Sequence, residues 1–93
     1  MKLMGQIAER FGIGCTCACT ATGIGMAANA HCVASTRNIL KVSSQLNGPM
    51  ELSDDIIKGG PFKYNKGFLK VPEGPGLGVE LDEKKVEKYR AKA

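Results

Sequence analysis

The sequence predicts an α/β fold in which a short parallel sheet packs against helices. Three observations lead to this class: a helical period over residues 2–11, a strand-like run over 13–20, and a second helix and strand over 24–36 and 39–46. Such an alternation is typical of parallel strands joined by helical crossovers. Two parallel strands leave their faces and edges exposed, so the pattern requires more strands than this chain supplies.

The first helix is predicted from apolar residues at helical spacing, with polar residues opposite. The apolar residues are Leu3, Met4, Ile7, Ala8 and Phe11. Gly12 follows at the position of a C-terminal cap. The helix starts next to Met1 without a capping residue before it, which we interpret as an indication that upstream sequence is missing.

The next elements are predicted from their small and apolar residues. The run 13–20 has the near-continuous composition of a parallel strand that is buried on both faces. The helix over 24–36 is rich in alanine, which allows close packing against a sheet, and its candidates for burial are Met26, Ala27, Ala30, Val33 and Ala34. The second strand, 39–46, is predicted to end at the turn sequence Asn47-Gly48-Pro49.

The second half of the chain is predicted to hold smaller elements. The sequence Ser53-Asp54-Asp55 offers an N-cap for a short helical turn directly after it. Two short strands are expected over 62–64 and 68–71, joined by a three-residue turn. A final helix is expected to start after Asp82 and to run from Glu83 to Lys92.

Composition and charge narrow the class of protein. The chain has 93 residues, of which 43% are hydrophobic and 24% charged, and this balance is typical of a globular domain. The net charge of +4 comes from scattered lysines without a basic block between aromatics, so we expect no nucleic-acid partner. We also expect no membrane partner, because the sequence shows neither a signal peptide nor a long apolar span. A cytoplasmic location with four reduced cysteines is the resulting prediction.

The cysteines form a second pattern. Cys15, Cys17 and Cys19 alternate, so their side chains would share one face of a strand, and His31 and Cys32 follow on the next helix. A zinc site is one interpretation, but sulfurs in C-x-C spacing lie ~6–7 Å apart along a strand, which is far for ligands of one ion. We favour small buried residues over a metal or redox centre or a cysteine nucleophile paired with His31.

Several stretches resemble one enzyme family. The most specific is VPEGPGLGVELDE at residues 71–83, and further stretches are AERFGI at 8–13, TGIGMAANAH at 22–31 and QLNGP at 45–49. Together they resemble the closing part of the mandelate racemase and muconate lactonizing enzyme group of the enolase superfamily. The resemblance covers nearly the whole chain, and the Pro-Gly-rich run is similar to the point where those enzymes return to their capping domain.

The resemblance implies a partial (β/α) barrel, formed by its last two strand–helix units over residues 1–58. Residues 59–93 would be the C-terminal segment of an α+β capping domain. The implied chemistry is abstraction of a proton next to a carboxylate, giving an enediolate held by Mg²⁺. The family's metal ligands come from earlier strands, so this chain is expected to hold none, and Asp54 and Asp55 are better explained as a helix cap.

The resemblance also implies where a substrate pocket would lie. Barrel enzymes place their sites at the carboxyl ends of the strands, and the candidates there are Cys19, Thr20, Thr22, Gln45 and Asn47. Gln45 stands where members of this group often have an acidic residue, and a glutamine side chain forms hydrogen bonds but transfers no proton. No catalytic residue can be assigned from the sequence.

Two functions follow as expectations. In the first, the chain is a C-terminal fragment of an enolase-superfamily enzyme that acts as a lyase, epimerase or cycloisomerase on a small carboxylate, and the fragment is inactive alone. In the second, the chain is a non-catalytic module that completes a barrel through self-association or with a partner chain, because its parallel edges are exposed.

Overall fold

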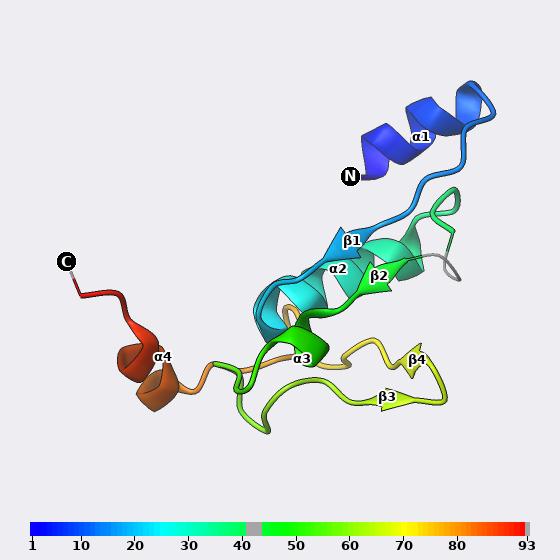
Figure 1. The fold of residues 1–93 in the computed structure, drawn as a ribbon. Coiled ribbons are helices and arrows are strands. Elements are labelled where there is room, and N and C mark those ends of the chain that lie inside the picture. Colours follow the sequence, from blue (N-terminus) through cyan, green and yellow to red (C-terminus); the bar gives the residue numbers. More distant parts are fainter. Residues whose placement is uncertain (41–43, 93) are drawn as a thin grey trace.

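The computed structural model describes residues 1–40 and 44–92 (Figure 1). The elements in chain order are α1 (Lys2–Arg10), β1 (Ala18–Cys19), α2 (Gly23–Ser35), β2 (Gln45–Leu46), α3 (Gly48–Glu51), β3 (Tyr64–Asn65), β4 (Phe68–Leu69) and α4 (Glu83–Tyr89). The predicted order of helix, strand, helix and strand is confirmed for the first half of the chain. No helix among the described residues is long and apolar enough to cross a membrane.

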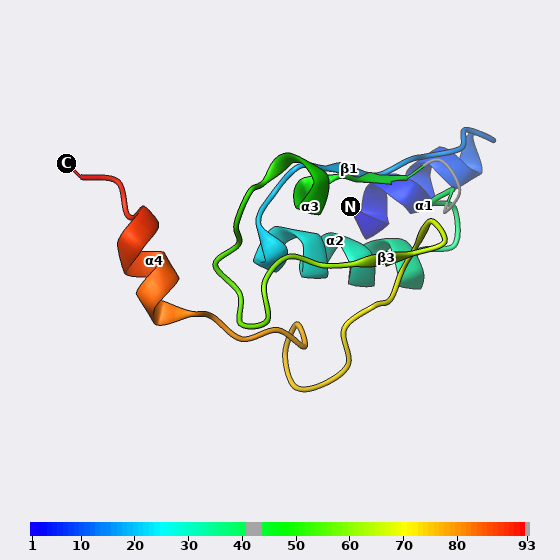
Figure 2. The same cartoon turned by 60° about the horizontal axis from the view of Figure 1, so that its bottom comes forward.

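β1 and β2 form a parallel pair that lies over α2 (Figure 2). Ala18 pairs with Gln45, Cys19 pairs with Leu46, and an isolated bridge joins Cys15 to Ile39. Regular pairing is shorter than the predicted strands 13–20 and 39–46. Beside this pairing, the backbone N–H of Cys17 bonds to the Ser44 side chain at 3.3 Å. Residues 41–43 of the predicted second strand lie outside the described residues.

The core lies between this strand pair and α2. Cys17, Val33 and Ile39 form a buried cluster, against which Cys15 and Leu46 pack. Met26 and Ala27 of α2 are completely buried. Cys15, Cys17 and Leu46 therefore point towards α2, as the predicted alternation of the cysteines requires.

α1 ends as its sequence predicts. Gly12 has a φ of 69°, its N–H bonds to the carbonyl of Glu9, and the N–H of Ile13 bonds to the carbonyl of Ala8. This is the Schellman arrangement, which a residue with a Cβ adopts only with strain. The start of α1 at Lys2 follows Met1 directly, and Met1 makes no side-chain cap.

The predicted end of the second strand before Asn47 is confirmed, since β2 ends at Leu46, but the turn sequence that follows opens the short helix α3 (Gly48–Glu51). Pro49 stands in its first turn, where a missing N–H is tolerated. The helical turn predicted after Asp55 is absent: Ile57 bridges to Leu81, and the Lys58 N–H bonds to the Glu80 carbonyl at 2.9 Å. Ile56 and Ile57 thus join the C-terminal segment by strand-like contacts instead of starting a helix.

The hairpin β3–β4 has a tighter turn than predicted. Asn65 pairs with Phe68, so two residues form the loop in place of three. Lys66 and Gly67 have φ values of 50° and 81°, which suit the right-handed twist of the strands. α4 ends at Tyr89 before the predicted Lys92, and Asp82 caps it as predicted by accepting bonds from the N–H groups of Lys84 and Lys85.

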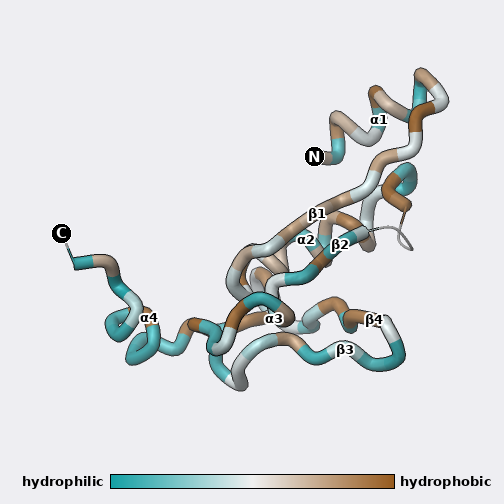
Figure 3. Tube along the Cα trace, in the orientation of Figure 1, coloured by the Kyte–Doolittle hydropathy of each residue, from teal (hydrophilic) through white to brown (hydrophobic). Residues whose placement is uncertain are grey.

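The chain is less compact than a complete domain of its length. Its accessible surface is 6853 Å², compared with about 5,200 Å² for a compact monomer of this mass. Its radius of gyration is 14.7 Å, compared with about 12 Å for a compact domain of this length. α4 projects from one end (Figure 2), and apolar stretches run along the peripheral elements α1 and β4 (Figure 3). Much apolar surface that a complete domain would bury is open here.

Candidate functional site

The carboxyl ends of β1 and β2 lie side by side and carry the predicted pocket residues. The Asn47 N–H bonds to the Cys19 carbonyl at 2.9 Å, which keeps the two strand ends together. Strand alternation sends neighbouring side chains to opposite faces. Gln45 is exposed on the face away from α2, and Thr20 beyond β1 is also exposed. The register of Ala18 with Gln45 therefore brings Thr20 and Gln45 to one open face.

Cys19 has a different orientation. It is buried, and its sulfur accepts a bond from the Asn29 side chain of α2 at 3.3 Å. Thr22 lies at the N-cap of α2, and its carbonyl accepts the Met26 N–H at 2.9 Å. Asn47 is half-buried at the end of β2. The five predicted residues thus occupy neighbouring loops and strand ends without converging on a single face.

Asn29 connects two thiols on the helix side of the sheet. The Cys17 thiol donates to the Asn29 side-chain oxygen at 3.1 Å, and the Asn29 amide donates to the Cys19 sulfur. Burial, followed by the nearby Cys19 and Cys32, raises the pKa of the Cys17 thiol. A raised pKa keeps sulfur protonated and weakly nucleophilic. These cysteines therefore act as packed, hydrogen-bonded core residues.

Asp55 is a buried polar residue that caps a helix, but not the short helical turn after Ser53-Asp54-Asp55 that the sequence predicts. It is 2% exposed, and its two carboxylate oxygens accept the Gly23 N–H at 2.9 and 2.8 Å. Gly23 is the first residue of α2, so Asp55 caps that helix across 32 residues of sequence. A negative charge there also suits the helix dipole. Asp55 in this way holds the β1–α2 loop that carries Thr20 and Thr22.

Asp54 points to the other side and anchors α4. Its carboxylate accepts bonds from the Lys85 ammonium at 2.5 Å and the Tyr89 hydroxyl at 2.8 Å. These two bonds, with a third from the Asp55 N–H, hold the pKa of the Asp54 carboxyl well below its usual range. Although they are adjacent, Asp54 and Asp55 therefore bind separate partners.

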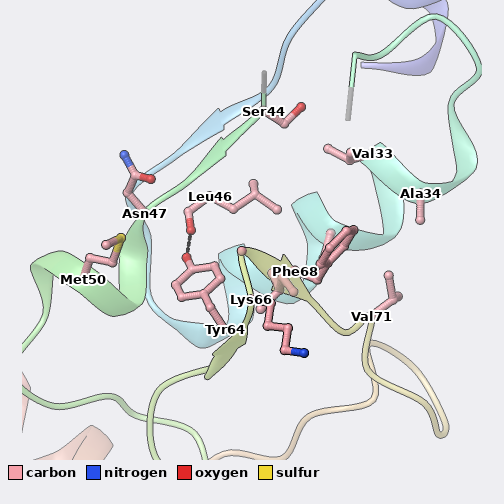
Figure 4. A pocket seen from close by; sticks show the side chains of 13 residues that line it. Val33, Ala34, Ser44, Leu46, Asn47, Met50, Tyr64, Lys66, Phe68 and Val71 are labelled. Carbon is pink, nitrogen blue, oxygen red and sulfur yellow. Dashed lines mark hydrogen bonds between the residues drawn. The ribbon is translucent and has the colours of Figure 1, made fainter. Parts of the chain in front are cut away.

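An apolar pocket of about 870 Å³ lies between α2, β2 and the β3–β4 hairpin (Figure 4). Val33, Leu46 and Phe68 line it, and the Tyr64 hydroxyl donates to the Leu46 carbonyl across it. Burial raises the pKa of Tyr64. The pocket lies on the α2 side of β2, whereas Gln45 faces away from α2. It is a space that the sequence prediction did not include, because it depends on how the hairpin folds back.

The comparisons with known proteins agree with this architecture. Residues 1–85 match the family described as enolase C-terminal domain-like. The chain belongs to this family. It is 44% identical over 62 residues to muconate cycloisomerase 1-1 of Acinetobacter lwoffii, covering 67% of this chain and 16% of the relative. It is 29% identical over 85 residues to D-gluconate dehydratase of Thermoproteus tenax, covering 91% of this chain and 17% of the relative.

A solved structure extends the similarity to the fold. The muconate lactonizing enzyme from Klebsiella pneumoniae matches 96% of this chain with a TM-score of 0.85 and 31% identity, and the match covers 25% of that enzyme. The predicted fold class, a segment of a (β/α) barrel, and the predicted enolase-superfamily membership are both confirmed. The chain spans about a sixth of the length of the curated relatives named above.

The residues of this enolase-family segment do not fit a Mg²⁺ site. Within residues 1–40 and 44–92, no three His, Cys, Asp or Glu side chains are grouped so that they could hold a metal ion. Mg²⁺ is held through oxygen ligands such as carboxylates. The neighbouring carboxylates Asp54 and Asp55 are already bound to Lys85, Tyr89 and the Gly23 N–H.

The division of the chain into a barrel segment, residues 1–58, and a capping-domain segment, residues 59–93, remains a prediction.

Proposed function

We propose that this chain is the C-terminal barrel segment of an enolase-superfamily enzyme that abstracts a proton next to the carboxylate of a small substrate. The single observation that supports this most is the agreement in fold over 96% of the chain with an enzyme four times as long. The relatives named above are a cycloisomerase and a dehydratase, and an epimerase is also similar to this chain, so the proposed reaction belongs to the lyase, epimerase or cycloisomerase class.

In this proposal the chain contributes substrate binding. Gln45 and Thr20 are exposed at the strand ends, on the face away from α2. A glutamine amide and a threonine hydroxyl can each donate a hydrogen bond to a carboxylate, but neither is a general base near neutral pH. The base and the ligands of any Mg²⁺ would come from other strands, since Asp54 and Asp55 are already bound to other groups and the described residues contain no cluster of metal ligands. The isolated chain is therefore expected to be inactive. A cytoplasmic location is a separate part of the proposal.

A chimeric enzyme tests this proposal. Residues 1–93 would replace the matching quarter of the Klebsiella muconate lactonizing enzyme, and turnover would be measured with muconate, acid sugars and dipeptides in the presence of Mg²⁺. We expect turnover of at least one carboxylate. Gln45→Ala should raise KM more than it lowers kcat and leave the pH profile unchanged, because Gln45 binds and does not transfer a proton. Lys84→Ala on exposed α4 is the control.

Two results would contradict the proposal. A folded chimera with no turnover of any carboxylate would exclude a working barrel segment. Clear Mg²⁺-dependent turnover by the purified 93-residue chain would show that the segment is not dependent on other strands. A change in the pH profile with Gln45→Ala would reject the binding role given to Gln45.

A further inference from the structure

The loop between β1 and α2, residues 20–22, is held at its end by Asp55. The N–H of Gly23, directly after the loop, donates to both carboxylate oxygens of Asp55 at 2.9 and 2.8 Å. One of these oxygens also accepts the Ile56 N–H at 2.7 Å, which fixes the carboxylate at its own end of the contact. Asp55 is 2% exposed, so little water competes for these bonds. The contact therefore fixes the point at which the loop ends.

A second contact holds the same loop at Gly48. A Cβ at Gly48 would lie 2.1 Å from the carbonyl oxygen of Ala21 and 2.9 Å from the Cγ atom of Met26. Gly48 is buried, so only a residue without a side chain fits there. One residue earlier, the Asn47 N–H bonds to the Cys19 carbonyl at 2.9 Å. The close approach of β1 and β2 thus continues past the strand ends into the loop.

Both contacts come from one short segment of the chain, residues 48–55, which we call the clamp. It begins with α3, and α3 lies beside the loop between β1 and α2 (Figure 1, Figure 2). The Leu52 N–H bonds to the Gly48 carbonyl at 3.1 Å, which closes this helix at its C-terminal end. The clamp therefore connects Gly48 to Asp55 through a hydrogen-bonded turn.

We propose that Gly48 and Asp55 are positioning residues, which set the place of the Thr20 hydroxyl relative to the Gln45 amide and thereby the affinity for the substrate carboxylate. Gln45 is fixed in β2 by its pairing with Ala18. Thr20 lies beyond the paired residues of β1, so its position depends on the loop that the clamp holds. The inference rests on the proposed function and deepens it, because two donors bind one carboxylate well only at the correct separation.

The geometry separates this role of Asp55 from proton transfer. The two carboxylate oxygens face the N–H groups of Gly23 and Ile56, and the residue is buried. A general base has to lie within hydrogen-bond distance of the proton that it removes, directly or through one water. Asp55 therefore acts on a substrate only through the loop.

Kinetics of the chimera described above test the positioning role. Asp55→Ala removes the acceptor of the Gly23 N–H and should raise KM at least tenfold, with a smaller change in kcat. Asp55→Asn keeps a side-chain oxygen as acceptor, so its KM should stay within about threefold of the unsubstituted value and its pH profile should not change. Gly48→Ala places a Cβ against the Ala21 carbonyl and should raise KM as Asp55→Ala does.

Ile39→Ala is the control for a general loss of stability. Ile39 is 3% exposed and bridges to Cys15, at the opposite end of the strand pair from the loop. Its truncation leaves a cavity in the core and destabilises the fold without a contact to the loop. Ile39→Ala should therefore leave KM unchanged at a temperature at which all the variants are folded.

Hydrogen exchange of the Gly23 amide tests the clamp without any turnover. It would be measured by NMR in the 93-residue chain, relative to the amide of Ala30 in the middle of α2. This ratio cancels the effect of global unfolding, which exposes both amides. We expect it to rise at least tenfold in Asp55→Ala, because Gly23 loses its acceptor, and to stay unchanged in Ile39→Ala.

The outcomes separate this inference from the proposed function. An unsubstituted chimera without turnover counts against the proposed function, and hydrogen exchange then decides on the clamp. A Gly23 amide that exchanges equally fast with and without the Asp55 carboxylate overturns the clamp. In an active chimera, a KM of Asp55→Ala or Gly48→Ala no higher than that of Ile39→Ala overturns the positioning role of that residue. A pH profile altered by Asp55→Asn overturns the role of Asp55 in favour of proton transfer.

Discussion

The carboxylate of Asp55 caps the first residue of α2, Gly23, from a position 32 residues later in the chain. Both oxygens lie within 2.9 Å of the same backbone nitrogen, and one of them also accepts the Ile56 N–H at 2.7 Å. This contact fixes where α2 begins after β1. The loop with Thr20 and Thr22 is therefore held by a residue that follows β2 in the chain.

Removal of the Asp55 carboxylate should destabilise the chain. Asp55→Ala leaves the buried Gly23 N–H without an acceptor, so we expect a loss of about 1.5–3 kcal/mol in the free energy of unfolding. Urea unfolding followed by circular dichroism measures this change. Glu73→Ala is the control, because Glu73 forms only an exposed pair with Lys70 and should change stability by less than about 0.5 kcal/mol. Equal stabilities of the two variants would contradict the capping role.

Gly23 should tolerate no side chain while Ile57 is present. A Cβ at Gly23 would lie 2.4 Å from the Cδ1 atom of Ile57, which is 4% exposed. Overpacking of this kind destabilises by about 1–3 kcal/mol. Gly23→Ala combined with Ile57→Ala should therefore lose less stability than the sum of the single changes, which a double-mutant cycle measures. Strict additivity would show that the two sites do not contact each other.

Local signals explain what could be predicted from the sequence. The helical period, the glycine after α1 and the Asp82 cap each act within one turn of chain, so α1, α2 and the start of α4 were predictable. The cysteine alternation likewise indicated a shared face. The Asp55–Gly23 contact was not predictable, because a carboxylate that caps a distant helix leaves no local pattern. α3 was missed because Asn47-Gly48-Pro49 suits a turn and a proline-led helix equally.

The candidate site shows the same limit. Thr20 directly follows Cys19, the last residue of β1, and adjacent side chains of extended backbone point to opposite faces, so only one of the two can lie on the face of Gln45. Which of the two does so depends on how β1 lies against α2. That orientation is set by the packing of Cys17 against Val33 and Ile39, a long-range contact. The sequence alone therefore predicts where the strand ends, but not which of its side chains face α2.

The pair of Asp54 with Lys85 should make the anchoring of α4 dependent on pH. The pKa of Asp54 is lowered from 3.8, so its stabilising contribution is complete above that value and is lost as the pH falls through the lower folded-state pKa. Carbon-detected NMR of the Asp54 carboxyl should give a midpoint below 3.8. Lys85→Met should move the midpoint upward. A wild-type midpoint at or above the unfolded value would show that the Lys85 and Tyr89 bonds are not formed.

The four cysteines should differ in their reaction with a thiol reagent. Cys17 and Cys19 are buried, Cys15 and Cys32 are partly exposed, and burial raises the pKa of Cys17. Because the thiolate is the reactive form, Cys17 should react most slowly at pH 8, with at least a tenfold slower rate than Cys32. Mass spectrometry of alkylated peptides over time measures each rate, and urea should equalise them. Fast labelling of Cys17 in the folded chain would mean that the strand pair opens readily from α2, since Asn29 and the Val33 cluster are what exclude the reagent.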